Sequence, residues 1–235
     1  MRNHIEQERN SLDIPKRTFV KRIVAKFKIN PENIPYFIFP IVEFIRYEKP
    51  DLIIVLDSGA RLTGLTVLLL YRELYGRLPT QDGILHFDRI SHGFSYEQVV
   101  NSLKEKYSQQ LCGGETKTIL IIDDWTNTGR TSSMVRKAIS EISNNKIRTV
   151  VGVMREFFTG FADLKGDDFS IAQTTWHHNS RQIGIEYEGL IPKVVRSKEA
   201  LNIRKIIIEN VLLFASQVRL LNGKELDEIL RTRSN

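Results

Sequence analysis

The chain has 235 residues, 41% apolar and 26% charged, which is typical of a single globular domain, and its net charge of +6 favours an anionic ligand without requiring one. Its single cysteine, Cys112, excludes an internal disulfide and a cysteine-based metal cluster. No apolar run approaches the ~20 residues that span a bilayer, and the first ten residues are too polar for a signal peptide, so we expect a cytoplasmic protein that does not bind membranes.

The first predicted element is a basic amphipathic helix over residues 13–28. Phe19, Ile23 and Phe27 recur every four residues and form an apolar face, and lysines and arginines surround it. A charged rim of this kind is usually a solvated surface, and contact with nucleic acid is the alternative. A second helix is predicted over 37–48.

The remaining predicted elements alternate between strands and helices. They are a strand at 52–56, a helix at 62–76, an irregular polar stretch at 77–116, a strand at 118–122, a helix at 129–143, a strand at 148–154, a mixed region to 192 and a helical tail at 197–235. Aliphatic strands separated by helices predict an α/β fold whose mainly parallel sheet is covered on both faces. We expect residues 49–156 to form the core, with a helical extension at 1–48 and a hood and helical tail at 157–235.

Polar residues follow both of the strongly aliphatic strands. The strand at 52–56 runs into Asp57-Ser58-Gly59-Ala60-Arg61, and the strand at 118–122 runs into Asp123-Asp124 and a loop rich in Thr, Asn and Gly. In parallel sheets, ligands bind beyond the carboxyl ends of the strands. Both loops are therefore expected to line one crevice.

The second loop combines two kinds of ligand-binding group. A helix that begins near residues 128–130 would present unpaired backbone N–H groups to a phosphate, with Gly129 allowing close approach and Thr128, Thr131 and Ser132 offering hydroxyls. The two carboxylates would repel that phosphate, so they must face sugar hydroxyls or a magnesium ion. A ribose phosphate satisfies both halves of the loop.

This loop has three alternative interpretations. A nucleotide-binding P-loop would need glycine and lysine where this chain has Asp124 and Arg130. A receiver domain places its acidic pair before the phosphorylated aspartate, whereas Asp57 precedes the pair here. A strand–turn–helix in which the Asp and Thr side chains serve only as caps is the structural alternative.

The stretch ILIIDDWTNTGRTS, residues 119–132, resembles the signature of the type I phosphoribosyltransferases for phosphoribosyl diphosphate (PRPP). It has the same apolar run, acidic pair and short loop to Thr-Gly-x-Thr. The resemblance is strong over 118–135, fair over 50–76 and only topological elsewhere.

The resemblance implies a role for each matching position. Asp123 and Asp124 would hold the ribose hydroxyls and, with PRPP, a Mg²⁺ ion. The loop around the 5′-phosphate would consist of Thr126, Asn127, Thr128, Gly129, Arg130 and Thr131. The pyrophosphate loop would consist of Ser58, Gly59, Ala60 and Arg61. Arg61 would be the basic residue that assists the leaving group, although many members place their Lys or Arg directly before a glycine.

The acceptor side of the predicted site departs from the family. Members that act on 6-oxopurines carry an aspartate where this chain has Asn127, and an amide cannot take a proton from the base. Trp176 would stack on a flat acceptor and Glu186 would read its edge; the alternative for Trp176 is an aromatic side chain that packs in the core or the hood. A mobile catalytic loop is expected at 86–98, where Arg89 and His92 would reach the pyrophosphate. His177 and His178 are adjacent and would point to opposite faces of an extended segment, which argues against a joint metal site.

The resemblance therefore implies transfer of ribose 5-phosphate from PRPP to an unidentified, nucleobase-like acceptor, and it also implies a homodimer. The alternative is a PRPP- or nucleotide-sensing regulator of the same fold that binds RNA or DNA without turnover. A nucleotide-modification or stress-operon enzyme that uses an unusual acceptor is a third reading.

Overall fold

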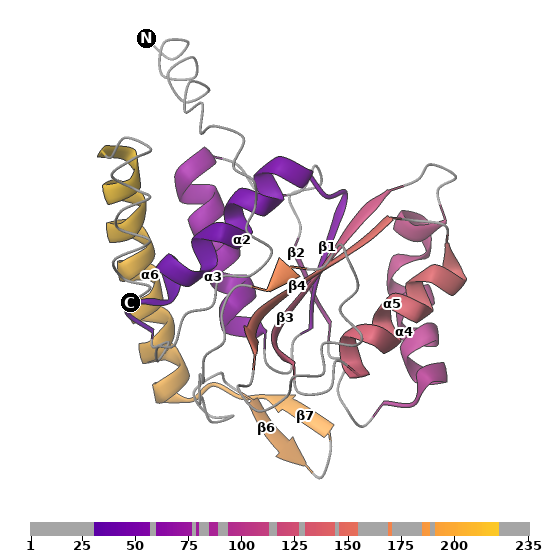
Figure 1. The fold of residues 1–235 in the computed structure, drawn as a ribbon. Coiled ribbons are helices and arrows are strands. Elements are labelled where there is room, and N and C mark those ends of the chain that lie inside the picture. The colour runs from indigo at the N-terminus through magenta and orange to yellow at the C-terminus, as the bar shows by residue number, and fades with distance from the viewer. Residues whose placement is uncertain are drawn as a thin grey trace.

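The computed structural model describes residues 31–56, 60–76, 79, 85–88, 94–112, 117–126, 130–143, 146–154, 169–170, 185–188 and 191–220. These residues form an α/β fold in which a parallel sheet lies between two layers of helices (Figure 1). The predicted basic helix at 13–28 and the end of the predicted tail, 221–235, lie outside the described residues.

The central sheet has five parallel strands in the order β2-β1-β3-β4-β5. They are β1 (Leu52–Leu56), β2 (Leu85–Asp88), β3 (Thr118–Thr126), β4 (Lys146–Met154) and β5 (Phe169–Ser170). All of β1 is buried, as is the aliphatic run 119–122 of β3. Strands covered on both faces must be apolar at consecutive positions, which explains why these two runs lack the alternation of a half-exposed strand.

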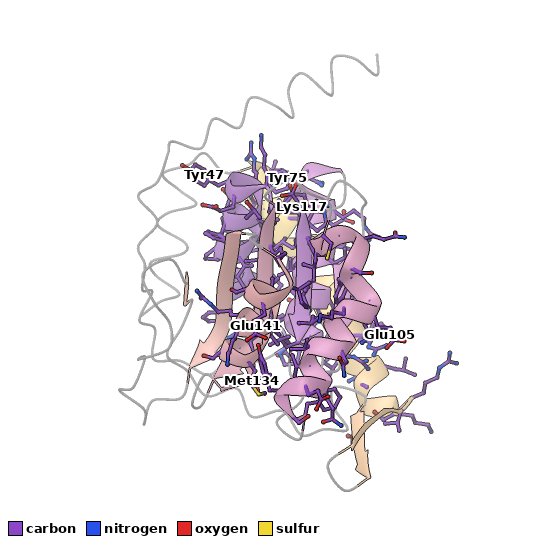
Figure 2. All side chains as sticks on the ribbon, turned by 90° about the vertical axis from the view of Figure 1, so that its right-hand side faces the viewer. Tyr47, Tyr75, Glu105, Lys117, Met134 and Glu141 are labelled. Atoms are coloured by element: carbon purple, nitrogen blue, oxygen red, sulfur yellow. The ribbon has the colours of Figure 1, made fainter. Side chains whose placement is uncertain are left out.

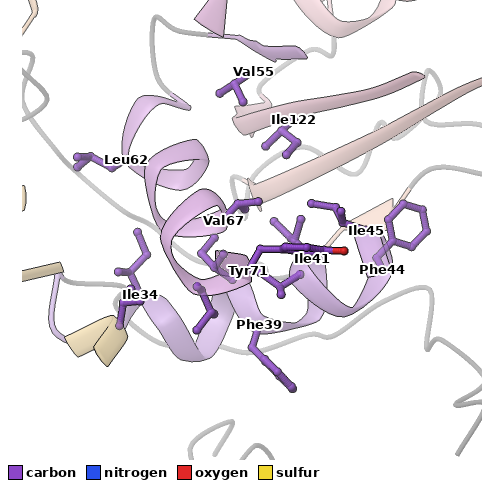
Figure 3. Close-up of a cluster of buried hydrophobic side chains, with 14 of the residues drawn as sticks. Ile34, Phe39, Ile41, Phe44, Ile45, Val55, Leu62, Val67, Tyr71 and Ile122 are labelled. Carbon is purple, nitrogen blue, oxygen red and sulfur yellow. The ribbon is translucent and has the colours of Figure 1, made fainter. Parts of the chain in front are cut away.

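One face of the sheet is covered by α2 (Ile34–Glu48), α3 (Arg61–Tyr75) and α6 (Lys198–Leu220). Val55 and Ile122 point from the strands into this layer, where they join residues of α2 and α3 (Figure 3). The layer is held further by aromatic packing, because Phe214 of α6 makes edge-to-face contacts with Tyr36 and Phe39 of α2 at 4.6 and 5.5 Å between ring centroids.

The opposite face is covered by α4 (Tyr96–Leu111) and α5 (Arg130–Ile142), which lie in front of the sheet in Figure 2. α4 begins with a capping box in which Ser95 and Gln98 satisfy each other's backbone N–H groups. Its contact with α5 includes Lys137 over the ring of Tyr96, at 4.7 Å from the centroid. Burial of the Tyr96 hydroxyl, together with the Glu141 carboxylate, raises the pKa of this phenol to about 12.

A separate antiparallel hairpin is formed by β6 (Ile185–Glu188) and β7 (Ile191–Val194). In Figures 1 and 2 it lies below the sheet, on the side where the carboxyl ends of the parallel strands lie.

The predicted α/β architecture is confirmed, and β1, α3 and α5 lie within one residue of their expected bounds. The prediction for 77–116 was wrong, because this stretch contains β2 and α4. The prediction that a strand ends at residue 122 was also wrong: β3 continues to Thr126 by pairing with β4, so the acidic pair lies within the strand. α2 begins three residues before the expected position, where Pro35 fits the first turn of a helix.

Among the helices that the structure describes, none is both long and apolar enough to cross a membrane.

The aromatic contact between α6 and α2 gives a test of the fold. Phe214→Ala should lower the free energy of unfolding by about 3–5 kcal/mol, because it removes a side chain that is 2% exposed and leaves a cavity. Tyr47→Ala, at a position that is 61% exposed, should change it by less than about 0.5 kcal/mol. Urea unfolding followed by circular dichroism measures both, and equal losses in the two variants would contradict this packing.

Candidate functional site

The direction of the chain connections reverses between β1 and β3. The chain leaves β1 through α3 toward β2, and it leaves β3 through α5 toward β4, in the opposite direction along the sheet. α3 therefore covers one face and α5 covers the other, as right-handed crossovers require. Such a reversal between neighbouring strands opens the sheet at their carboxyl ends, where doubly wound proteins bind their ligands.

Asp123 lies at this point of the sheet. Val55 of β1 is in register with Ile122 of β3, so Asp123 follows the last of these pairs, where β1 ends. Asp123 is 8% exposed and lies on the strand face that α5 covers, two residues after Ile121. A carboxylate buried to this degree requires polar partners, because loss of hydration disfavours its charge.

Ser132, in the first turn of α5, is one of those partners. Its hydroxyl donates to Oδ2 of Asp123 at 3.4 Å, and the Ser132 side chain is itself buried. The bond joins residues nine positions apart across the connection between β3 and α5. Ser132 was expected to offer its hydroxyl to a phosphate, and the structure instead directs it to the carboxylate.

Two helices begin at this edge of the sheet. α3 starts at Arg61 after Ala60, whose N–H donates to the carbonyl of Leu56 at 3.1 Å, and no N-cap side chain bonds the start of this helix. α5 starts at Arg130, and neither helix has an acidic residue in its first turn. The N-terminus of a helix carries partial positive charge and N–H groups without helical acceptors, so both starts favour anionic groups.

The two helix starts lie on opposite sides of the central strands, since α3 belongs to one layer and α5 to the other. The buried Asp123 lies at the end of the strand pair from which both helices depart. The arrangement is therefore two positive helix ends separated by a carboxylate. It suits a ligand with an anionic group at each end and hydroxyl groups between them.

The structure brings part of the predicted site together at this edge. Ala60, Arg61, Asp123 and Thr131 lie there with their side chains described, and Ala60, Asp123 and Thr131 are buried. Asp124, Thr126 and Arg130 are placed by their backbone in β3 and α5. Ser58, Gly59, Asn127, Thr128 and Gly129 lie outside the described residues.

The acceptor residues are less completely described. Glu186 lies in β6 of the hairpin near the carboxyl edge, and its backbone alone is described. Arg89, His92, Trp176, His177 and His178 lie outside the described residues. Of the catalytic loop expected at 86–98, residues 86–88 belong to β2 and residues 96–98 belong to α4, so residues 89–95 remain between these two elements.

The comparisons with known proteins give the following result. No family model matches the sequence, and no curated protein matches it. Among solved structures, the chain is similar to a purine phosphoribosyltransferase from Pyrococcus horikoshii Ot3, with 17% identity and a TM-score of 0.40 over 64% of this chain and 92% of the other. It is also similar to a hypoxanthine-guanine-xanthine phosphoribosyltransferase, with 14% identity and a TM-score of 0.36 over 72% and 90% of the two chains. Both scores are below 0.5, so the function has to be inferred from the residues of this chain.

The bond between Ser132 and Asp123 predicts unequal effects of two neighbouring substitutions. Ser132→Ala should lower the free energy of unfolding by about 1 kcal/mol, because it removes a donor from a buried carboxylate at a long bond distance. Ser133→Ala, one residue further along the helix at a less buried position, should change it by less than about 0.5 kcal/mol. Chemical denaturation measures both, and an equal effect of the two substitutions would contradict a role for Ser132 in holding Asp123.

Proposed function

We propose that the chain is a phosphoribosyltransferase that binds PRPP between the ends of β1 and β3 and transfers ribose 5-phosphate to a nucleobase-like acceptor, with release of pyrophosphate. One observation carries the proposal: the buried Asp123 of the sequence IIDDWTNTGRT lies within β3 where the pairing of β1 with β3 ends, between the starts of α3 and α5. PRPP has a phosphate at one end, a pyrophosphate at the other and vicinal hydroxyls between them. The two anionic ends of PRPP would face the two positive helix starts, and its hydroxyls would face the carboxylate between them.

Electrostatics assigns each end of PRPP to a helix. A phosphate cannot lie against Asp123, since two unit charges 4 Å apart repel by about 4 kcal/mol at an effective dielectric constant of about 20. The 5′-phosphate is therefore assigned to the start of α5, because the N-terminus of a helix favours anionic groups and the first turn of α5 contains no acidic residue. The sugar hydroxyls are left for Asp123 and Asp124, whose carboxylates accept hydrogen bonds.

The pyrophosphate would lie at the start of α3. Ala60 and Arg61 follow β1, on the far side of the strand pair from α5, and the first turn of α3 contains no acidic residue. The Arg61 guanidinium and the helix start would stabilise the charge that develops on the leaving group. Ser58 and Gly59 complete this loop in the proposal.

The residues present also fit a magnesium ion. Carboxylate oxygens are suitable ligands, and Asp123 and Asp124 would supply them. Within the described part of the chain, no three His, Cys, Asp or Glu residues are grouped to hold a metal by themselves. Mg²⁺ would therefore arrive with PRPP, whose phosphates commonly complete its ligand set, and it would neutralise charge on the pyrophosphate.

The reaction breaks the bond between C1 of the ribose and the pyrophosphate oxygen, and a bond from C1 to the acceptor forms. The sugar gains positive charge as the first bond weakens, and the negative Asp123 and Asp124 would offset it. The hydrogen bond from Ser132 would keep Asp123 oriented toward the sugar. Trp176 and Glu186 are proposed to bind the acceptor. Because Asn127 is unable to accept a proton, the proton that the acceptor loses would pass to the released pyrophosphate or to water.

The second candidate is a PRPP- or nucleotide-sensing regulator that uses the same site without turnover. The net charge of +6 and the basic segment at 13–28 favour it, because both suit RNA or DNA as a partner. The two candidates share the binding step and differ in pyrophosphate release.

Substitution of the acidic pair tests the proposal. Asp123→Asn and Asp124→Asn should each weaken PRPP binding in the presence of Mg²⁺ by about 10- to 100-fold, because each removes a charged hydrogen-bond acceptor worth roughly 1.5–3 kcal/mol. Asp51→Asn is the matched control: Asp51 lies at the opposite, amino end of the sheet, where its carboxylate accepts from the Thr118 N–H at 2.7 Å. Its PRPP affinity should stay within about twofold of the parent chain.

Isothermal titration calorimetry measures the affinities, and a pyrophosphate assay across a panel of nucleobases measures turnover. Failure of the parent chain to bind PRPP, or an equal loss in the Asp51 variant, would refute the site. Tight PRPP binding that is lost in the Asp123 and Asp124 variants, without pyrophosphate release for any acceptor, would favour the regulator.

A further inference from the structure

The outer face of α6 carries an unusual share of exposed apolar surface. Of the six large hydrophobic side chains exposed among the described residues, five belong to this helix, namely Leu201, Ile208, Leu212, Leu213 and Leu220. The opposite face of α6 is already packed on α2 and α3 through buried residues such as Phe214 and Val218. In Figure 1 α6 is the outermost helix of its layer, so this face points away from the sheet.

The exposed face contains a self-complementary row of side chains. Leu201, Lys205, Glu209 and Leu213 are four residues apart and lie along one ridge of the helix. Lys205 and Glu209 form an ion pair at 3.8 Å and are 74% and 61% exposed. If a second α6 lies antiparallel across a two-fold axis between them, Leu201 faces Leu213, and Lys205 faces Glu209, on both sides of the axis.

We propose that α6 is a dimer interface, and that its exposed face packs antiparallel against the same face of a second copy of this chain. A two-fold interface requires one patch to match itself in shape and charge, and the order Leu-Lys-Glu-Leu does so in the reversed direction. Ile208 and Leu212 lie beside this ridge and add apolar surface to the contact. A different protein bound to this face would not require the row of side chains to match itself in the reversed direction.

α6 belongs to the layer that contains α2 and α3, whereas the site lies at the carboxyl edge of the sheet. The inference does not depend on the proposed function. A contact made mainly by one pair of helices is small for a specific interface, so the dimer should dissociate on dilution.

Charge reversal tests the pairing of Lys205 with Glu209. In the full-length chain, Lys205→Glu should bring like charges together across the axis, and Glu209→Lys should do the same with the opposite sign. Each variant alone should dimerise at least about tenfold more weakly than the parent chain. An equimolar mixture of the two variants should recover dimers, since each now meets its opposite charge in the other. Sedimentation velocity over a wide concentration range measures all four samples.

Two further variants keep the result interpretable. Leu201→Ser combined with Leu213→Ser should also reduce dimerisation by at least about tenfold, and circular dichroism checks that the helices remain folded. The control is the ion pair of Lys137 and Glu141 on α5, at 3.9 Å and with 67% and 51% exposure, whose reversal should leave dimerisation unchanged. A monomeric parent chain, a dimer insensitive to the α6 substitutions, or a mixture that fails to recover dimers would overturn the proposal. The first of these results would indicate that the face is covered by residues 1–30 or 221–235, or by no partner.

Discussion

The burial of the Asp123 carboxylate is the constraint on which the rest of the site depends. A buried negative charge destabilises a fold unless polar partners offset its lost hydration. If the charge served no function, an apolar residue at this position would give a more stable fold. Asp123 instead continues the alternation of Ile119 and Ile121 on the same strand face and bonds to Ser132. Its place at the end of the strand pair, rather than in the middle, is what makes the charge usable by a ligand.

The architecture around Asp123 follows from the two aliphatic strands. Because β1 and β3 are apolar at consecutive positions, they must be covered on both faces, and helices from both directions along the chain supply the cover. Opposite crossovers then bring the starts of α3 and α5 to the same edge on different sides. The strand order is shared by several doubly wound folds, which bind ligands at the carboxyl edge of the sheet, and the loop residues decide what binds there.

The sequence predicted the parts of the fold that are set locally. The aliphatic run of β1 and the helices that follow β1 and β3 were located within a residue. α4 was missed because its composition is polar, although the capping box of Ser95 and Gln98 and the spacing of Val99, Leu103 and Tyr107 were readable signals.

The remaining differences arise from tertiary contacts. β3 extends to Thr126 because β4 pairs with it there, and no local pattern in the acidic segment reveals that pairing. The partner of Ser132 depends on the rotation of α5 against β3, which fixes whether a hydroxyl in the first turn faces the ligand or the strand. The sequence alone showed that a hydroxyl is present at this position and did not show which partner it would have.

The most direct test of where PRPP binds is to identify the backbone amides whose NMR signals shift when the ligand is added. In two-dimensional NMR spectra of the ¹⁵N-labelled chain, PRPP with Mg²⁺ should shift the amide signals at both helix starts, around Arg61 and Thr131, and at Asp123. Ribose 5-phosphate, which lacks the pyrophosphate, should shift those near Thr131 and Asp123 and leave Arg61 unchanged. Shifts confined to the amino end of the sheet, around Asp51 and Thr118, or no shifts with either ligand, would contradict the placement of the sugar and both anionic groups.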